Sequence, residues 1–242
     1  MHKESDMRPY QKMMIDHVID VKKGALYAGM GLGKTVAVLT AIDRMKFAEL
    51  LDKPVLVLAP LRVAKDVWPN EPAEWEHLKH MRVVPIVGKE YQRRAAFHVP
   101  ADVYTINYEN FSWLVKTWGE HWPYGMLVID ESTKLKSLRA TIRSNKDGTE
   151  WVQGQGGIRA KALLKVVYHF KTERIVELSG TPAPNGLKDL WGQIFFLDFG
   201  QRLGRVYDAF ITRWFRPKFD GFGHDPLPHA EKEIKNRIKD VC

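Results

Sequence analysis

The sequence predicts an α/β fold in which a central, mostly parallel sheet is flanked by helices on both faces. Short β-branched runs alternate with longer amphipathic stretches along the 242 residues, as expected when strands and helices alternate. The short runs lack the polar alternation of half-exposed strands, which indicates burial on both faces. Ligands of such sheets bind at the carboxyl ends of the strands, and every motif of this chain falls at such an end.

The individual elements follow from this pattern. Five strands are expected, at 25–28, 54–60, 102–107, 126–130 and 175–179. Helices are expected at 9–21, 33–51 and 186–197. The polar, glycine-rich segment 143–159 is expected to be a mobile loop, and 199–229 to pack irregularly. Ile234, Ile238 and Val241 stand at helical spacing, which predicts a last helix.

Composition and charge favour a soluble protein with a polyanionic partner. Cys242 is the only cysteine, so an intrachain disulfide and a cysteine-based zinc site are excluded, and a reducing, intracellular setting is expected. The N-terminus is polar and the apolar runs are only strand-length, so no membrane role is expected. The formal charge of +8 favours nucleic acid, although many soluble proteins are simply basic.

Residues 28–35 read Ala-Gly-Met-Gly-Leu-Gly-Lys-Thr, which fits a phosphate-binding loop with Ala in place of the first Gly. Gly31 and Gly33 let backbone N–H groups turn inward around phosphate oxygens. Lys34 supplies a positive charge, and the Thr35 hydroxyl is suited to Mg²⁺. The residues expected to contact the nucleotide in this phosphate loop are Gly29, Met30, Gly31, Leu32, Gly33, Lys34 and Thr35.

Asp130 and Glu131 end the strand expected at 126–130. A carboxylate in this position holds Mg²⁺ through water, and a second one orients and deprotonates an attacking water. Alone, the pair would be two solvated acids, but a phosphate loop upstream makes it specific. We therefore expect Asp130 to be the Mg²⁺ acid and Glu131 the general base. This disfavours a small-molecule kinase, because a kinase must keep water from the phosphate that it transfers.

Six strings occur in order along the chain: RPYQ (8–11), GMGLGKT (29–35), APLRV (59–63), TINYE (105–109), DEST (130–133) and LSGTPAPNGLKDLW (178–191). Together they resemble the N-terminal motor domain of superfamily 2 helicases, in particular the Swi/Snf-type DNA-dependent ATPases and their short phage and bacterial relatives. The resemblance covers about 7–198. It implies a RecA-like fold, ATP and Mg²⁺ as cofactors, and a cytoplasmic location in a bacterial cell or a phage-infected host.

The resemblance also implies roles for residues outside the phosphate loop and the acid pair. Gln11 would read the adenine edge with its side-chain amide, and Arg8 and Tyr10 would lie beside the nucleotide. The motif that couples hydrolysis to movement between two motor domains matches Ser179, Gly180 and Thr181. The nucleic-acid contacts that the resemblance implies are Pro60, Leu61, Arg62, Asn107 and Tyr108.

The acid pair has two further features. The fourth residue of the string DEST (130–133), usually His or Asp in this family, is Thr133. Ser132 and Thr133 are suited to hydrogen-bond across to the coupling motif. A basic run follows, and because it adjoins the expected nucleic-acid groove, phosphate contact is favoured over a solvated face. Its members are Lys134, Lys136, Arg139, Arg143 and Lys146.

A motor of this family works with two RecA-like domains, the second of which supplies arginines to the γ-phosphate. We expect 1–198 to be the N-terminal ATP-binding domain. Residues 199–242 are expected to be an irregular segment and a terminal helix leading toward a second RecA-like domain, in cis or in trans. Double-stranded DNA is the expected partner, on the resemblance alone. The chain by itself should bind ATP and hydrolyse it slowly.

Two alternatives remain open at the level of the sequence. The first is a nucleotide-responsive DNA-binding module without turnover. The second is the ATPase of a viral packaging motor, which shares the phosphate loop and the acid pair. RPYQ and SGTPxxN argue against the packaging motor.

Overall fold

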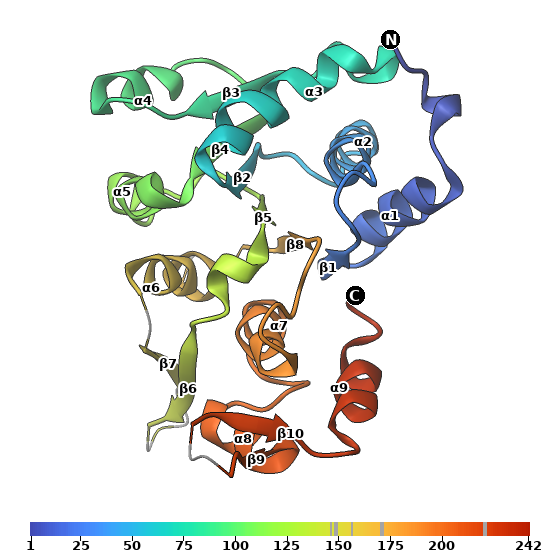
Figure 1. Ribbon diagram of the computed structural model, residues 1–242. Coiled ribbons are helices and arrows are strands. Elements are labelled where there is room, and N and C mark those ends of the chain that lie inside the picture. The colour runs from blue at the N-terminus through green and yellow to red at the C-terminus, as the bar shows by residue number, and fades with distance from the viewer. Residues whose placement is uncertain (146, 148–149, 156, 170–171, 220–221) are drawn as a thin grey trace.

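Six parallel strands form the central sheet, and from edge to edge they are β1 (Lys23–Tyr27), β8 (Arg174–Ser179), β5 (Met126–Asp130), β2 (Val55–Ala59), β4 (Val103–Asn107) and β3 (Val83–Ile86) (Figure 1). The computed structural model describes residues 1–242 except 146, 148–149, 156, 170–171 and 220–221. The five expected strands are confirmed near their expected bounds. β3 was not expected because Pro85 interrupts its apolar run, and a sheet edge is where a strand tolerates proline.

Helices cover both faces of the sheet, which confirms the predicted fold class. One face carries α1 (Pro9–Asp20), α2 (Lys34–Phe47) and α3 (Trp68–Glu74). The other face carries α5 (Tyr108–Trp118), α6 (Ile158–Leu164) and α7 (Leu190–Asp198), and α4 (Glu90–Ala96) packs beside β3. Short 3₁₀ or π turns occupy Glu4–Asp6, Val63–Val67, Glu76–Leu78, Ser132–Leu135, Lys165–His169 and Leu187–Asp189.

Residues 199–242 are more regular than the sequence suggested. They form α8 (Tyr207–Trp214), a hairpin of β9 (Phe215–Pro217) and β10 (His224–Pro226), and α9 (Ala230–Ile238). The expected last helix is confirmed, and Ile234 and Ile238 are buried in the same apolar core as α7. The Val241 carbonyl accepts a hydrogen bond from the Ala25 N–H at 2.6 Å, so the tail lies along the edge strand β1 (Figure 1).

The prediction of a loop at 143–159 is wrong for most of the residues of this segment that the structure describes, and residues 146, 148–149 and 156 lie outside them. β6 (Arg139–Ser144) and β7 (Glu150–Gln155) pair as an antiparallel hairpin, and α6 begins at Ile158. The hairpin forms because Ile142 and Val152 face each other across it and pack on the core. The polar residues around them concealed this short alternation.

No helix among the described residues has both the length and the apolar character needed to span a bilayer.

Glu177 is a buried acid in the middle of the sheet, on β8 between Ala25 of β1 and Ile129 of β5. Among the described residues, neither oxygen of its carboxyl group has a hydrogen-bond partner. Burial raises the pKa of Glu177 well above its usual range, and the neighbouring Ser132 hydroxyl opposes this rise only in part. The hydrogen of the Ser132 hydroxyl is donated to Gln193 instead. Burial therefore favours the protonated form of the Glu177 carboxyl group in the folded protein.

We expect Glu177→Leu to raise the free energy of unfolding at pH 8 by about 1–3 kcal/mol, the cost of an unpaired buried polar group. Because the folded-state pKa is raised, the wild type loses stability as the pH rises above the unfolded-state value of about 4.3. The gain should therefore be larger at pH 8 than at pH 5 in urea unfolding. The exposed Glu173 gives the control, Glu173→Leu. An equal gain at both pH values would contradict this assignment.

Candidate active site

The phosphate loop joins β1 to α2 and is already folded as a cradle. Gly31 and Gly33 have φ values of +76° and +74°, a left-handed conformation that glycine adopts at little cost. The Lys34 ammonium donates to the Ala28 carbonyl at 2.7 Å and to the Gly29 carbonyl at 2.9 Å. Burial lowers the pKa of Lys34, and the Asp130 and Glu131 carboxylates oppose that fall. Lys34 thus lies between the loop and the acid pair.

Gln11 is brought against the phosphate loop by α1. A Cβ atom at Gly33 would lie 2.1 Å from Gln11 Nε2, so the glycine makes room for the amide. Gln11 Oε1 accepts a hydrogen bond from the Arg8 N–H at 2.8 Å, which caps the start of α1. Tyr10 is 40% exposed beside it. The amide is therefore next to the loop with one oxygen lone pair engaged, and adenine contact by Gln11 stays a prediction.

Asp130 and Glu131 begin a tight turn, 130–135, which we call the acid turn. Asp130 is the last residue of β5, and Glu131 has a φ of +62°, a strained conformation for a residue with a side chain that costs about 1–3 kcal/mol. The Thr133 hydroxyl donates to Glu131 Oε1 at 2.8 Å. One carboxylate oxygen of the predicted general base is therefore bound by the residue that stands at the family's His or Asp position.

Two buried aromatic residues, the first residues of α3 and α5, fix the acid turn. Trp68 Nε1 donates to Asp130 Oδ2 at 2.9 Å. The Tyr108 hydroxyl lies 2.8 Å from the Asp130 carbonyl and 3.2 Å from the Glu131 carbonyl, and donates to them. Burial raises the pKa of Asp130, and the Trp68 indole and the Lys34 ammonium oppose that rise.

The coupling motif lies beside the phosphate loop. Ser179 ends β8, and its carbonyl accepts a hydrogen bond from the Ala28 N–H at 3.1 Å. The Thr181 N–H donates to Ser179 Oγ at 3.1 Å. A Cβ atom at Gly180 would lie 3.1 Å from Met30 Cγ, so the two loops touch. The expectation that Ser132 and Thr133 hydrogen-bond to this motif is wrong, because the Ser132 hydroxyl donates to Gln193 and the Thr133 hydroxyl to Glu131. Gln193 in turn donates to the carbonyl of Pro182, the residue after the motif.

The residues expected to contact nucleic acid fall into two groups. Leu61 is 51% exposed, Arg62 and Lys134 are exposed, and Pro60 and Lys136 are half-buried. Asn107 and Tyr108 are buried. The polar groups of these two side chains bond within the protein, so the structure does not support direct contact between them and nucleic acid. Helix α5 starts at this point and turns Tyr108 inward, which the motif alone did not indicate.

The rest of the basic run is engaged within the protein. Arg139 donates to the Lys136 and Leu138 carbonyls, and its guanidinium lies 3.6 Å from the centre of the Tyr207 ring. Arg143 Nε donates to Gln153 Oε1 at 2.6 Å. Lys146 lies outside the described residues.

Two residues of the site were missed by sequence reasoning. Trp68 gave no signal beyond its apolar character. Gln193 did give one, because it is an amide in the otherwise apolar string LWGQIFF.

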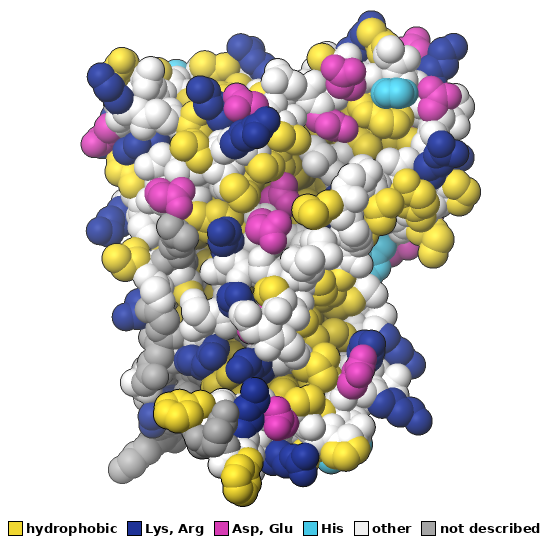
Figure 2. All heavy atoms as spheres, viewed as in Figure 1, with side chains coloured by type: hydrophobic (Ala, Val, Ile, Leu, Met, Phe, Trp, Pro, Cys, Tyr) yellow, Lys and Arg dark blue, Asp and Glu magenta, His cyan; other side chains and the backbone are white. Residues whose placement is uncertain are grey.

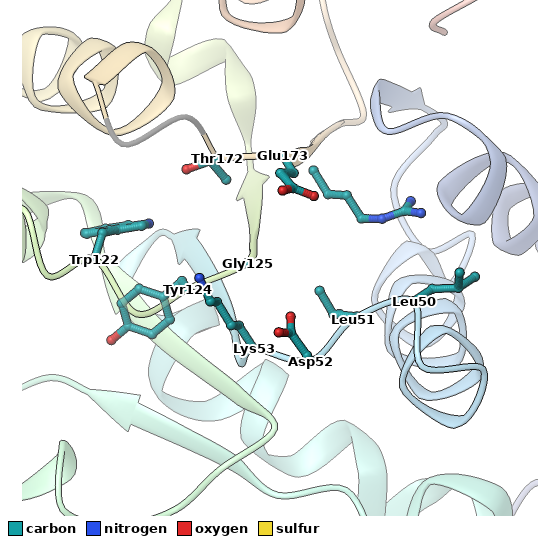
Figure 3. Close-up of a pocket in the computed structure, with 10 residues that line it drawn as sticks. Leu50, Leu51, Asp52, Lys53, Trp122, Tyr124, Gly125, Thr172 and Glu173 are labelled. Atoms are coloured by element: carbon teal, nitrogen blue, oxygen red, sulfur yellow. The ribbon is translucent and has the colours of Figure 1, made fainter.

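A cavity lies at the amino ends of the strands, at the end of the sheet opposite the phosphate loop (Figure 3). Its volume is about 310 Å³, and acids (Asp52, Glu173) and cations (Lys53, Arg174) line it in equal number. The Arg174 guanidinium is turned away to donate to the Ile19 carbonyl at 3.0 Å. Mixed charge does not select a polyanion, so this cavity is not a second phosphate site.

The chain is similar to several known proteins. A family model described as SNF2-related domain matches residues 10–146. Protein p41 of Acyrthosiphon pisum secondary endosymbiont phage 1 is 44% identical over 97% of this chain, which spans 49% of p41. The human SWI/SNF-related matrix-associated actin-dependent regulator of chromatin subfamily A member 1 is 28% identical over 81% of the chain, which spans 17% of that protein.

Solved structures share the fold. The SWI2/SNF2 ATPase core of Sulfolobus solfataricus in complex with dsDNA superposes with a TM-score of 0.71 at 23% identity, over 98% of this chain and 43% of that one. The chain thus spans about half the length of the phage relative and less than half of the archaeal ATPase core.

We expect Gly33→Ala to destabilise the protein more than Gly31→Ala. Both substitutions place a Cβ atom in the left-handed region, at about 1–2 kcal/mol each. Around Gly31, no described atom lies within 4 Å of the added Cβ, whereas at Gly33 it would collide with the Gln11 amide. Urea unfolding of both variants measures the difference, which should shrink when Gln11→Ala is added. Equal losses, or a difference that Gln11→Ala leaves unchanged, would show that Gln11 does not pack on Gly33.

Proposed function

The chain belongs to the SNF2-related domain family, and on that premise we propose that it is the ATP-binding half of a DNA-dependent ATPase that moves along duplex DNA. The observation that carries the proposal is the meeting of Lys34, Asp130 and Glu131 at the carboxyl ends of β1 and β5, which flank β8 in the sheet. The two carboxylates there act on the pKa of the ammonium. A phosphate-binding cation beside paired carboxylates suits hydrolysis of a nucleoside triphosphate.

The residues present fit Mg-ATP. The positive-φ glycines leave the loop backbone open toward a phosphate, and Lys34 is already held at the loop by two carbonyl groups that phosphate oxygens can replace. Thr35 and Asp130 would hold Mg²⁺, which when bound neutralises charge on the phosphates. Gln11 beside Gly33 would lie near the base, with Arg8 and Tyr10 at the rim of the site.

In hydrolysis, Glu131 and Thr133 of the acid turn and Lys34 of the phosphate loop have separate roles. The Glu131 carboxylate accepts a proton from the water that attacks the γ-phosphorus, while the bond to the ADP oxygen breaks. The Thr133 hydroxyl keeps that carboxylate in place. Lys34 stabilises the negative charge on the transferred phosphoryl group. A general base of this kind contributes about 10²–10⁴-fold in rate.

Duplex DNA is the proposed partner. The net charge of +8 favours a polyanion, and Lys and Arg side chains gather over the lower half of the face in Figure 2, where β6, β7, α8 and β9 lie in Figure 1. Pro60, Leu61, Arg62, Lys134 and Lys136 are the proposed contacts, and the archaeal relative named above was solved with dsDNA. Ser179, Gly180 and Thr181 would couple hydrolysis to movement.

Full turnover is proposed to need a second RecA-like domain, in cis or in trans, with 1–198 as the first. The phage relative p41 is about twice as long as this chain, which leaves room for one. Arginines supplied by such a domain would add about 10³–10⁵-fold to the rate. The chain alone should accordingly bind ATP well and hydrolyse it slowly.

Mg-ATP binding and ATP hydrolysis, each measured with and without duplex DNA, test the proposal. Lys34→Ala should weaken Mg-ATP binding about 10- to 100-fold, because a charge-assisted hydrogen bond is worth about 1.5–3 kcal/mol. Glu131→Gln should retain binding and lower turnover about 10²–10⁴-fold. The exposed Lys116 on α5 supplies the control, Lys116→Ala.

The outcomes separate the candidate functions. Turnover that duplex DNA stimulates and Glu131→Gln removes supports the ATPase. Binding of Mg-ATP and DNA without turnover, even after a second domain is supplied, would favour the nucleotide-responsive DNA-binding module. Mg-ATP binding that Lys34→Ala leaves unchanged would refute the site.

A further inference from the structure

Helix α7 sits directly on the acid turn. A Cβ atom at Gly192 would lie 3.0 Å from the Leu135 carbonyl oxygen and 3.4 Å from Leu138 Cβ, so glycine permits this close approach. Every residue of α7 is buried. A helix packed this closely transmits a displacement rather than absorbing it, because protein interiors have low compressibility.

Gln193, the next residue of α7, bonds at both ends of its amide. Oε1 accepts a hydrogen bond from Ser132 Oγ at 2.7 Å, and Nε2 donates to the Pro182 carbonyl at 2.6 Å and the Asp189 carbonyl at 3.0 Å. Two carbonyl acceptors on one side require the NH₂ group there, which fixes the orientation of the amide. Ser132 and Gln193 have no exposed surface, so breaking either contact leaves a buried polar group unpaired.

The far end of this connection reaches the phosphate loop. Pro182 lies two residues after Gly180. A Cβ atom added at Gly180 would lie 3.4 Å from the Met30 backbone nitrogen. The Asn185 N–H donates to the Asp189 carboxylate at 2.8 Å, which keeps 182–189 a single folded loop. The chain of contacts therefore runs from Met30 through Gly180 and Pro182 to Gln193 and on to Ser132.

The conformation of the phosphate loop depends on Lys34, which binds the Ala28 and Gly29 carbonyls. A triphosphate that takes Lys34 frees both carbonyl groups, and Met30 adjoins them in sequence. A change in the loop at Met30 then acts on Gly180 of the neighbouring loop, which lies against it.

We propose that Gln193 is a positioning residue that transmits occupation of the phosphate loop to the acid turn, so that Glu131 is set for hydrolysis only when nucleotide is bound. The inference rests on the proposed function and adds the path of contacts by which the phosphate loop acts on the acid turn. Gln193 has no exposed surface, so it acts through its bonds to Ser132 and Pro182 rather than on the nucleotide or the attacking water.

Hydrogen exchange of the full chain, with and without Mg²⁺ and the β,γ-imido analogue of ATP, tests this route without requiring turnover. In the wild type, nucleotide should protect the backbone amides of 29–36, 180–189 and 131–136. In Gln193→Leu, 29–36 should remain protected while the protection of 131–136 is lost. Ser132→Ala, which removes only one hydroxyl, should give the same result and serves if Gln193→Leu does not fold.

Steady-state kinetics provide a second readout that a merely structural role would not move. Both variants should lower kcat with KM for Mg-ATP unchanged, and the double variant should be no slower than the slower single one, because both break the same connection. Thr172→Val, which removes a buried hydroxyl at the opposite end of the sheet, is the matched control and should leave protection and kcat unchanged.

Two results would overturn the inference, and they differ from each other. Protection of 131–136 that persists in both Gln193→Leu and Ser132→Ala would refute the route while leaving the nucleotide site intact. Absence of protection at 29–36 in the wild type would refute the proposed function, and the route with it.

Discussion

The parallel alignment of β1, β8 and β5 is the constraint on which the rest of the site depends. In register, Tyr27 lies beside Ser179, and Leu178 beside Asp130. The phosphate loop, the coupling motif and the acid turn therefore leave the sheet side by side, although about 150 residues separate the first from the second. Because all three strands are buried on both faces, their register is fixed by apolar packing rather than by the polar residues that they present.

The acid turn illustrates how packing holds a strained backbone conformation. Glu131 has a left-handed backbone, and such strain persists only where the surroundings over-determine it. Here Trp68 binds the Asp130 carboxylate, Tyr108 binds the two carbonyl groups, and Ser132 is held by Gln193. Each partner comes from a different helix, so the conformation of the turn depends on the packing of α3, α5 and α7 together.

Those partners also link the turn to its surroundings. Trp68 follows the exposed Leu61–Arg62 segment, and Tyr108 starts the helix after β4. Trp68, which follows a segment proposed to meet DNA, and Gln193, which bonds to the loop that touches the phosphate loop, thus converge on the acid turn. A site of this kind is suited to make hydrolysis depend on what is bound at its margins, which is what a DNA-dependent ATPase requires.

The sequence predicted the elements whose signal is local. The phosphate loop needs glycine at positive φ, and the acid pair follows a continuous apolar run, so both could be found from residue types and spacing. The β6–β7 hairpin was missed because its few apolar residues stand among polar ones. The inward direction of Tyr108 and the roles of Trp68 and Gln193 depend on which helix packs on which turn, and a single sequence does not contain that information.

The most direct test of the account is a structure of this chain with Mg²⁺ and a non-hydrolysable ATP analogue. With the analogue bound, the Lys34 ammonium should leave the Ala28 and Gly29 carbonyls for phosphate oxygens, Mg²⁺ should lie between Thr35 and Asp130, and Glu131 should face the γ-phosphate. Nucleotide bound elsewhere, or Lys34 still bound to both carbonyls beneath a bound phosphate, would contradict it.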